Sequence, residues 1–201
     1  MWIKAVLQIS AALVLAVTAS PFSTTTRHVV QERRSEPPPR WSRHARLHPA
    51  ATIPVWTGLT QQNLHRAEEF MNQVAHPSSP DYGRHWSKEK AADMFAPTKE
   101  TVEAVKEWLH SLGIDPSRIR MSKSRIWLNF NATVSEVERL LQTEYPLYKH
   151  EMGHNHVACE SYSLPPHLTE HIDIVTPTVH FDTRTGSPGK TIHHKHLPVQ
   201  S

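Results

Sequence analysis

The strongest constraint on the fold is a predicted strand that leads directly into a predicted helix. Ile126, Leu128 and Phe130 stand at alternate positions, which is the pattern of a strand with one buried face. Thr133 and Glu136 follow with the spacing of a capping box, in which the threonine oxygen accepts from a backbone N–H of the first turn and the glutamate reaches back. The helix that begins there has one apolar face, formed by Val134, Val137, Leu140 and Leu141.

Comparable patterns place the other elements. An amphipathic helix is predicted from Thr60 onward, with an apolar stripe that consists of Leu64, Ala67, Met71 and Val74. Ser87 can cap a short helix that reaches Phe95, and Thr98 opens a longer helix that ends before Gly113. Further strands are predicted over 53–59, 118–122, 147–150, 157–162 and 172–175. This order predicts an α+β protein with a ferredoxin-like core, in which helices cover one face of an antiparallel sheet.

Residues 1–19 are typical of a secretory signal peptide. Lys4 precedes an apolar stretch over 5–17, and small residues predict cleavage between Ala19 and Ser20. The stretch is too short to span a bilayer comfortably, and a signal anchor is the alternative. We therefore expect a secreted, extracellular protein with no membrane segment once the signal is removed. In that setting Asn131, in the sequon Asn-Ala-Thr, is a predicted glycosylation site.

The remaining chain divides into three parts by composition. Residues 20–50 are expected to form an extended, disordered leader, because they hold Ser, Thr, Arg and a triple proline without an apolar period. Residues 51–182 are expected to form the folded domain. Residues 183–201 lack periodicity and are expected to be a linker or a tail.

Composition excludes several functions. None of the six glycines stands in a dinucleotide-binding, Walker A or hydrolase-elbow motif, so these chemistries are not expected. The formal charge is +3 with neutral histidines, and the basic stretch from Arg33 to Arg46 is interrupted by Glu36 and a triple proline, so no nucleic-acid partner is expected. A single cysteine, Cys159, excludes an internal disulfide.

Several segments match one known family in both their order and their spacing. They are 59–64, 77–85, 96–98, 105–109, 130–134, 162–165 and 171–173. Together they resemble the N-terminal activation domain of the sedolisin peptidases, which are secreted serine peptidases of the kumamolisin and tripeptidyl-peptidase type. The resemblance covers about residues 28–182.

This resemblance implies a ferredoxin-like propeptide, an intramolecular chaperone that also inhibits an endopeptidase or tripeptidyl peptidase until acid triggers cleavage. The partner would be a sedolisin-type peptidase domain, which this chain lacks. It would act in cis if the sequence is the front part of a zymogen, or in trans if the chain is a stand-alone inhibitor. The family's calcium site belongs to the peptidase domain, so no cofactor and no metal are expected here.

No catalytic residue can be assigned. The Gly-Thr-Ser setting of the family's nucleophile is absent from the sequence. Glu89 and Asp93 are four residues apart, which places both carboxylates on one helix face. Without a nucleophile to activate, a solvated helix face is the favoured interpretation of this pair.

The 16 histidines invite two functional interpretations. His85 and His171 lie in the family-like segments and are candidate pH sensors, because histidine titrates between about pH 5 and 8; ordinary surface or packed histidines are the alternative. Two clusters, His150, His154, His156 and His193, His194, His196, leave open a secreted His-rich metal-binding protein.

An inhibitor of the implied type binds through a few buried anchor residues. Trp56, Trp86 and Tyr82 are candidate anchors in this sequence. Positions in the core of the domain are the alternative for such large aromatic residues.

Overall fold

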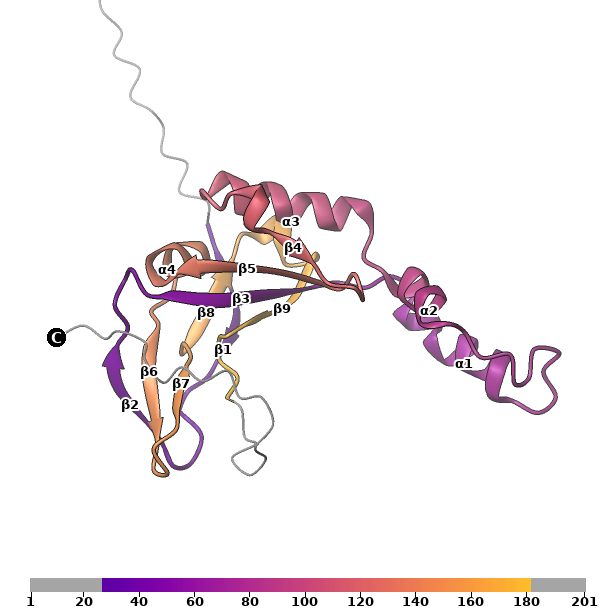
Figure 1. Ribbon diagram of the computed structural model, residues 1–201, viewed down its shortest axis with the longest axis horizontal. Helices are drawn as coiled ribbons and strands as arrows, with labels where there is room; N and C mark the ends of the chain where they lie inside the picture. The colour runs from indigo at the N-terminus through magenta and orange to yellow at the C-terminus, as the bar shows by residue number, and fades with distance from the viewer. Residues whose placement is uncertain (1–26, 182–201) are drawn as a thin grey trace, which may run out of the picture.

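An antiparallel sheet of four strands, in the order β4-β5-β3-β9, forms the centre of the fold (Figure 1). The computed structural model describes residues 27–181. The strands of this sheet are β3 (Thr52–Leu59), β4 (Arg120–Met121), β5 (Trp127–Thr133) and β9 (Ile172–Thr176). The central strand β3 pairs with β5 on one side and with β9 on the other. Three α-helices lie between β3 and β4 and one lies between β5 and β9, and the strand order confirms the predicted ferredoxin-like α+β fold.

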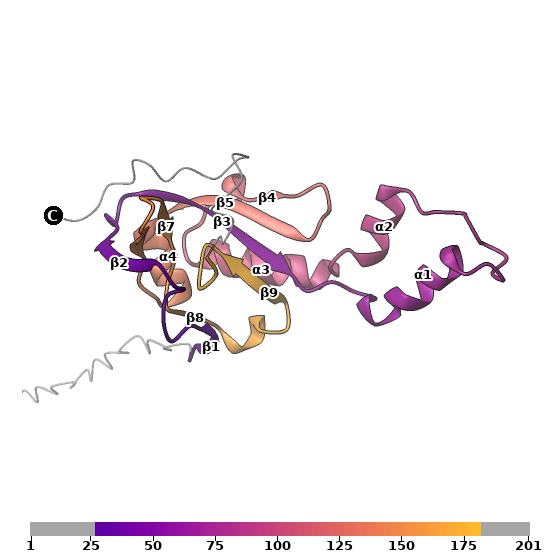
Figure 2. The same cartoon turned by 90° about the horizontal axis from the view of Figure 1, so that it is seen from below.

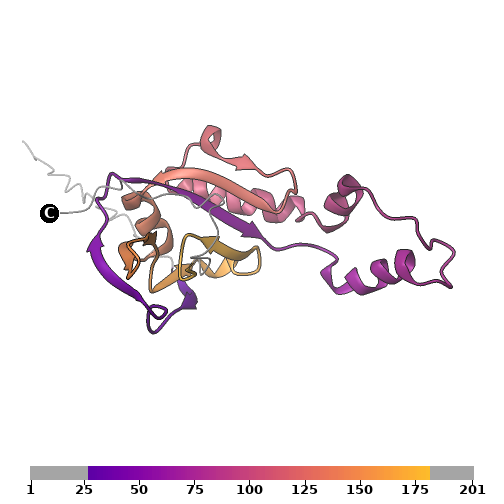
Figure 3. The same cartoon turned by 60° about the horizontal axis from the view of Figure 1, so that its bottom comes forward.

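Two helices, α3 (Lys99–Ser111) and α4 (Val134–Leu141), pack on one face of this sheet. Viewed from below, α3 lies behind the strands and no helix lies in front of them (Figures 2 and 3). Alternate strand residues are fully buried against the helices, as the pattern predicted. The buried strand residues include Ile53, Val55 and Leu128, and the helix residues that pack with them include Val105, Leu109, Val137 and Leu140.

Two smaller sheets flank this core and revise the expected leader. β1 (Val29–Arg33) pairs with β8 (Ser161–Leu164), and β2 (Trp41–Arg46) pairs with β6 (Pro146–His150), which in turn pairs with β7 (Asn155–Val157). Both β1 and β2 belong to the folded domain rather than preceding it, and the chain between them turns at Pro39 and Arg40, where Arg40 has a φ of 69°. Most side chains of β1 and β2 are exposed or half-buried, so neither strand shows the alternation that marks a strand in sequence.

A helical hairpin, α1 (Ala67–Ala75) and α2 (Lys88–Phe95), projects from the sheet between β3 and α3, and we call residues 60–97 the arm (Figure 1). Asn63 adopts a left-handed φ of 61°, so the predicted helix begins only after a 3-10 turn, η1 (Leu64–Arg66). The predicted apolar stripe is not a core face: Leu64 is 52% exposed and Met71 63%. Instead Phe70 is buried.

The helix caps follow the sequence closely. Ser87, Thr98 and Thr133 each accept a backbone N–H with their side-chain oxygen. Gly113 follows α3 with a φ of 91°, which a residue with a side chain rarely adopts. Two further 3-10 turns, η2 (Pro116–Arg118) and η3 (Pro166–Leu168), complete the described chain. The predicted strand over 157–162 is interrupted at 158–160 and contributes to both β7 and β8.

Glu136 joins the capping box to the loop before β4. Its carboxylate accepts two hydrogen bonds from the Arg118 guanidinium, at 3.0 and 3.1 Å, and one from the Thr133 backbone N–H at 2.7 Å. The hydrogen bonds from Arg118 lower the pKa of Glu136 from its ordinary 4.5 to about 2. The charged carboxylate therefore stabilises the fold above about pH 4.5, and that contribution is lost as the pH falls toward 2.

We expect Glu136→Gln to lower the free energy of unfolding by about 2–3 kcal/mol at pH 7, because it removes the charge that Arg118 binds. The difference from wild type should shrink as the pH falls from about 4.5 toward 2, and denaturant unfolding at several pH values measures it. Glu107→Gln on the exposed side of α3 is the control and should have little effect. A difference that stays constant from pH 7 to pH 3 would contradict this account.

Candidate docking surface

The sheet has one face that no helix covers, and we call it the sheet face. Along β3, Ile53 and Val55 point to the helices, whereas Trp56, paired with Asn129 and Thr176, is 39% exposed on the opposite side. The residues that register and burial place on the sheet face are Pro54, Trp56, Gly58, Arg120, Trp127, Asn129, Asn131, Ile174 and Thr176. This face is turned toward the viewer in Figure 2.

Gly58 lets the apolar side chains on the sheet face meet across β3. A Cβ atom at this position would lie 2.7 Å from Cγ2 of Ile174 and 3.1 Å from the ring of Trp127. Both side chains therefore close over the bare backbone of β3 from its two neighbouring strands. The result is an apolar surface that continues from β5 to β9, beside the exposed ring of Trp56.

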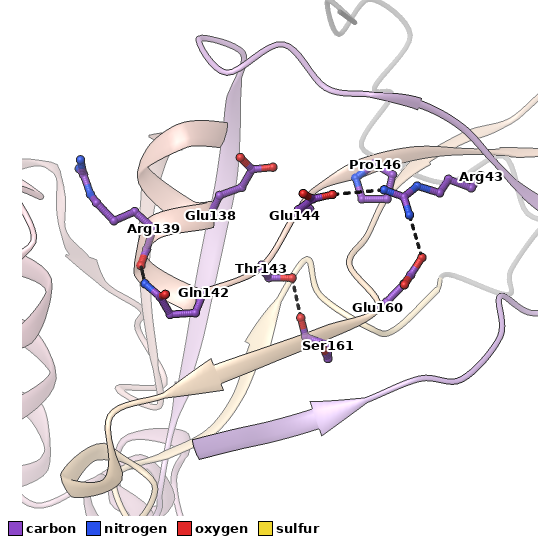
Figure 4. Close-up of a pocket in the computed structure, with 9 residues that line it drawn as sticks. All are labelled: Arg43, Glu138, Arg139, Gln142, Thr143, Glu144, Pro146, Glu160 and Ser161. Carbon is purple, nitrogen blue, oxygen red and sulfur yellow. Dashed lines mark hydrogen bonds and ion pairs between the residues drawn. The ribbon is translucent and has the colours of Figure 1, made fainter. Parts of the chain in front are cut away.

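A charged groove lies elsewhere, where β2 meets α4 and the start of β8 (Figure 4). Its volume is about 570 Å³. Arg43 binds the carboxylates of Glu160 at 3.1 Å and Glu144 at 3.4 Å, and Arg46 binds Glu138 at 3.1 Å. These charges compensate one another, so the groove holds β2 against the rest of the domain.

The end of the described chain is held firmly beside this groove. The Tyr145 hydroxyl donates to the Pro177 carbonyl at 2.6 Å, and Nε of Arg34 donates to the Val179 carbonyl at 2.6 Å. The ring of Phe181 packs against Trp41, Tyr148 and His156, with centroid distances of 4.9 to 5.4 Å. Burial raises the pKa of Tyr145 well above its ordinary value, so its hydroxyl stays a donor. Residues 177–181 therefore leave the domain from a fixed point.

The predicted pH sensors lie in different settings. His171 is largely buried, and its Nδ1 lies 3.0 Å from the Thr101 hydroxyl in the first turn of α3. Its Nε2 lies 3.9 Å from the Glu170 carboxylate. His85 is exposed in the loop between α1 and α2. Ala19 and Ser20, at the predicted signal cleavage site, lie outside the described residues.

The other predicted site residues also differ in their exposure to solvent. Asn131 is exposed on the sheet face, on the register position opposite Pro54. Trp56 and Tyr82 are exposed, whereas Trp86 is half-buried against Phe70. Trp127 and Ile174 were not predicted as members of this surface, although the alternation that buries Leu128 places Trp127 on the opposite face of its strand.

The predicted histidine clusters do not form a metal site within the described residues. No three His, Cys, Asp or Glu side chains within 27–181 are arranged to hold an ion, and His193, His194 and His196 lie outside this range. His150 is buried, with Nδ1 accepting the Met152 N–H at 3.2 Å, and Nε2 of His156 lies 3.0 Å from the His180 carbonyl.

The remaining candidate reactive groups are either exposed to solvent or packed in the core. Glu89 and Asp93 are exposed on α2, and Asp93 pairs with Arg125. Hydrogen bonds to its own backbone and to Ser87 lower the pKa of Glu89. Burial raises the pKa of Cys159 to about 12, which leaves it a packed thiol rather than a nucleophile.

Comparison with known families agrees with this geometry. The family model for the pro-kumamolisin activation domain matches residues 39–181, which is nearly all of the folded part. The chain belongs to this family. The match includes β2, which places the domain boundary before residue 51.

Several curated proteins are similar to this activation domain. Tripeptidyl-peptidase sed1 of Aspergillus fumigatus is 44% identical over 164 residues, which are 81% of this chain and 25% of that protein. Aorsin of Aspergillus oryzae is 38% identical over 88% of this chain and 27% of its own length. Tripeptidyl-peptidase SED1 of Arthroderma otae is 38% identical over 83% of this chain and 25% of its own length. The chain thus spans about a quarter of these relatives.

Among the described residues of the activation domain, no helix is both long enough and apolar enough to cross a bilayer. The longest described helix, α3, has 13 residues, and about 20 apolar residues are needed to span the hydrocarbon core.

We expect Gly58→Ala to lower the free energy of unfolding by about 1–3 kcal/mol, because the added methyl group displaces Ile174 and Trp127. Combining it with Ile174→Ala removes the closest contact. Denaturant unfolding of both single variants and the double variant measures the coupling between the two positions. Ile174→Ala should cost less in the Gly58→Ala background than in wild type, and equal costs would contradict the close approach.

Proposed function

We propose that this activation domain is the propeptide of a secreted, acid-activated serine-type peptidase, an endopeptidase or a tripeptidyl peptidase. In this role it assists folding of a sedolisin-type peptidase domain and inhibits it by docking through the sheet face. The observation that carries the proposal is the uncovered apolar surface of Trp56, Trp127 and Ile174 on a domain of this family. Three relatives whose names describe tripeptidyl-peptidases or aorsin support the choice of partner.

The sheet face suits a chaperone and inhibitor for a physical reason. Its strands are fixed by the core beneath them, so the surface is formed before a partner arrives and little entropy is lost on docking. Burial of apolar surface supplies the affinity. The fixed exit at residues 177–181 supports a role in which the following segment is presented to the peptidase active site.

Secretion and glycosylation belong to the same proposal. The signal peptide over 1–19, with cleavage between Ala19 and Ser20, would bring the chain into the secretory pathway. The exposed side chain of Asn131 supports glycosylation at this residue. Because Asn131 lies on the sheet face, a glycan there would stand beside the docked peptidase domain.

A second candidate function is a stand-alone inhibitor that acts in trans. The described residues contain the whole ferredoxin-like core and both of its helices, which favours folding without an attached peptidase. The docking surface is the same in both cases. The two differ in whether the peptidase domain belongs to the same polypeptide.

We expect the secreted chain to inhibit the peptidase domain of Aspergillus fumigatus tripeptidyl-peptidase sed1. Trp56→Asp should weaken inhibition at least tenfold, because it places a charge in the centre of the apolar surface. Lys106→Asp, on the exposed side of α3, is the matched control and should inhibit as wild type does. Inhibition constants from substrate hydrolysis measure the effect. No inhibition by wild type, or equal losses in both variants, would contradict the proposal.

We also propose that His85 and His171 contribute to release of the peptidase in acid. His171 joins two elements of the domain, because its Nδ1 lies 3.0 Å from the Thr101 hydroxyl in the first turn of α3, and histidine side chains change charge between about pH 5 and 8. The double variant His85→Gln/His171→Gln should therefore release the peptidase only at lower pH than wild type. Inhibition measured from pH 7 to pH 4 tests this, with His110→Gln as the control. An unchanged pH dependence would refute the role of these two histidines.

A further inference from the structure

We propose that the arm is a second docking element, which holds the same peptidase domain as the sheet face through the apolar side chains of Leu64, Met71 and Tyr82. This inference rests on the proposed function and adds a separate contact to it. All three views show the arm extending away from the sheets (Figures 1 to 3). Leu64, Met71 and Tyr82 are 52%, 63% and 57% exposed, respectively.

The arm is held together by its own small core. The ring of Phe70 lies 5.2 Å from Trp86 and 6.1 Å from Phe95, measured between centroids. The Arg66 guanidinium lies 4.6 Å from the centre of the Phe70 ring, and the Lys90 ammonium lies 4.7 Å from that of Trp86. These contacts use the side of α1 that faces α2.

The base of the arm is closed by hydrogen bonds within the arm and is joined to the body at Thr60, whose hydroxyl donates to the Asp173 carboxylate of β9 at 2.7 Å. The side-chain amide of Asn63 donates to the Met94 carbonyl at 2.8 Å, and that of Gln61 donates to the Phe95 carbonyl at 3.3 Å. Arg125, in the turn between β4 and β5, forms an ion pair with Asp93 of α2. The arm therefore leaves the body in a defined direction, so its exposed side chains are presented at a fixed place.

A second set of apolar side chains on the arm is exposed, in η1, in α1 and in the loop after α1. Leu64 lies in η1 and Met71 in α1, and more than half of each side chain is exposed. Burial of these side chains by a partner is favourable, because it removes apolar surface from water. Tyr82, in the loop between α1 and α2, adds an aromatic ring with a polar end, and Met71 has a side chain that adapts to the shape of a partner.

The proposed partner of the arm is the peptidase domain, because of where the exit at Phe181, the sheet face and the arm lie in the fold. β3 carries Trp56 and Gly58 on the sheet face and continues directly into the arm, so one strand connects the two surfaces. The exit at Phe181 packs on β2, and Figure 1 places β2 and the arm at opposite ends of β3. A partner attached after Phe181 that covers the sheet face and reaches the arm must be as large as a domain, and three quarters of the length of the relatives lies outside the matched part.

Hydrogen exchange tests the two surfaces separately. The secreted chain is measured alone and with the peptidase domain of Aspergillus fumigatus tripeptidyl-peptidase sed1. We expect slower exchange on binding both in β3 and β5 and in residues 64–75 of the arm.

A pair of variants provides the second readout. Leu64→Glu/Met71→Glu should weaken inhibition at least tenfold, whereas Asn72→Glu, an exposed neighbour on α1, should leave it unchanged. Thermal unfolding of the chain alone checks that both variants are folded. Tyr82→Ala, outside the helices, gives the same test without a change in helix α1 and should weaken inhibition severalfold.

The outcomes separate the two proposals. Protection of the strands without protection of the arm, together with normal inhibition by Leu64→Glu/Met71→Glu, would overturn the docking role of the arm and leave the proposed function intact. Protection of neither surface would overturn both. Concentration-dependent protection of the arm without any peptidase would show that a second copy of the chain covers it, and would also overturn this inference.

Discussion

The central strand β3 is the element on which the rest of the structure depends. Its hydrogen bonds join β5 to β9 and so close the ferredoxin-like sheet. The side chains of Ile53 and Val55 enter the core beneath the helices, whereas Trp56 faces outward. Gly58 allows the neighbouring strands to cover the backbone with Trp127 and Ile174. One strand of eight residues thus supports the core, the docking surface and the base of the arm.

The sequence predicts those parts of the fold that depend on neighbouring residues. The capping box at Thr133, the caps at Ser87 and Thr98 and the turn at Gly113 are all local, and the structure confirms them. β1 and β2 could not be found in this way, since β1 pairs with β8 from far along the chain and neither strand buries one whole face. The interpretation of Leu64 and Met71 as a core stripe was wrong because helical spacing shows an apolar side but does not show what covers it.

The candidate site was predictable only in part for a related reason. Trp56 was predicted as a candidate anchor because it is a large aromatic residue. Trp127 and Ile174 lie beside it only because β5 and β9 are the two neighbours of β3. The alternation within one strand does not predict which strands are its neighbours. The contact between His171 and Thr101 likewise requires β9 and α3 to meet, although the two residues are 70 positions apart.

The chemistry of the sheet face limits how acid could act on the proposed complex. The side chains that define this face include no carboxylate and no imidazole, so burial of its apolar surface does not itself depend on pH in the acid range. In the proposed function, release therefore depends on groups elsewhere in the domain. Arg43 and Arg46 join β2 to the carboxylates of Glu138, Glu144 and Glu160. Because β2 also carries Trp41, which packs on Phe181, these ion pairs connect the charged groove to the exit of the chain rather than to the sheet face.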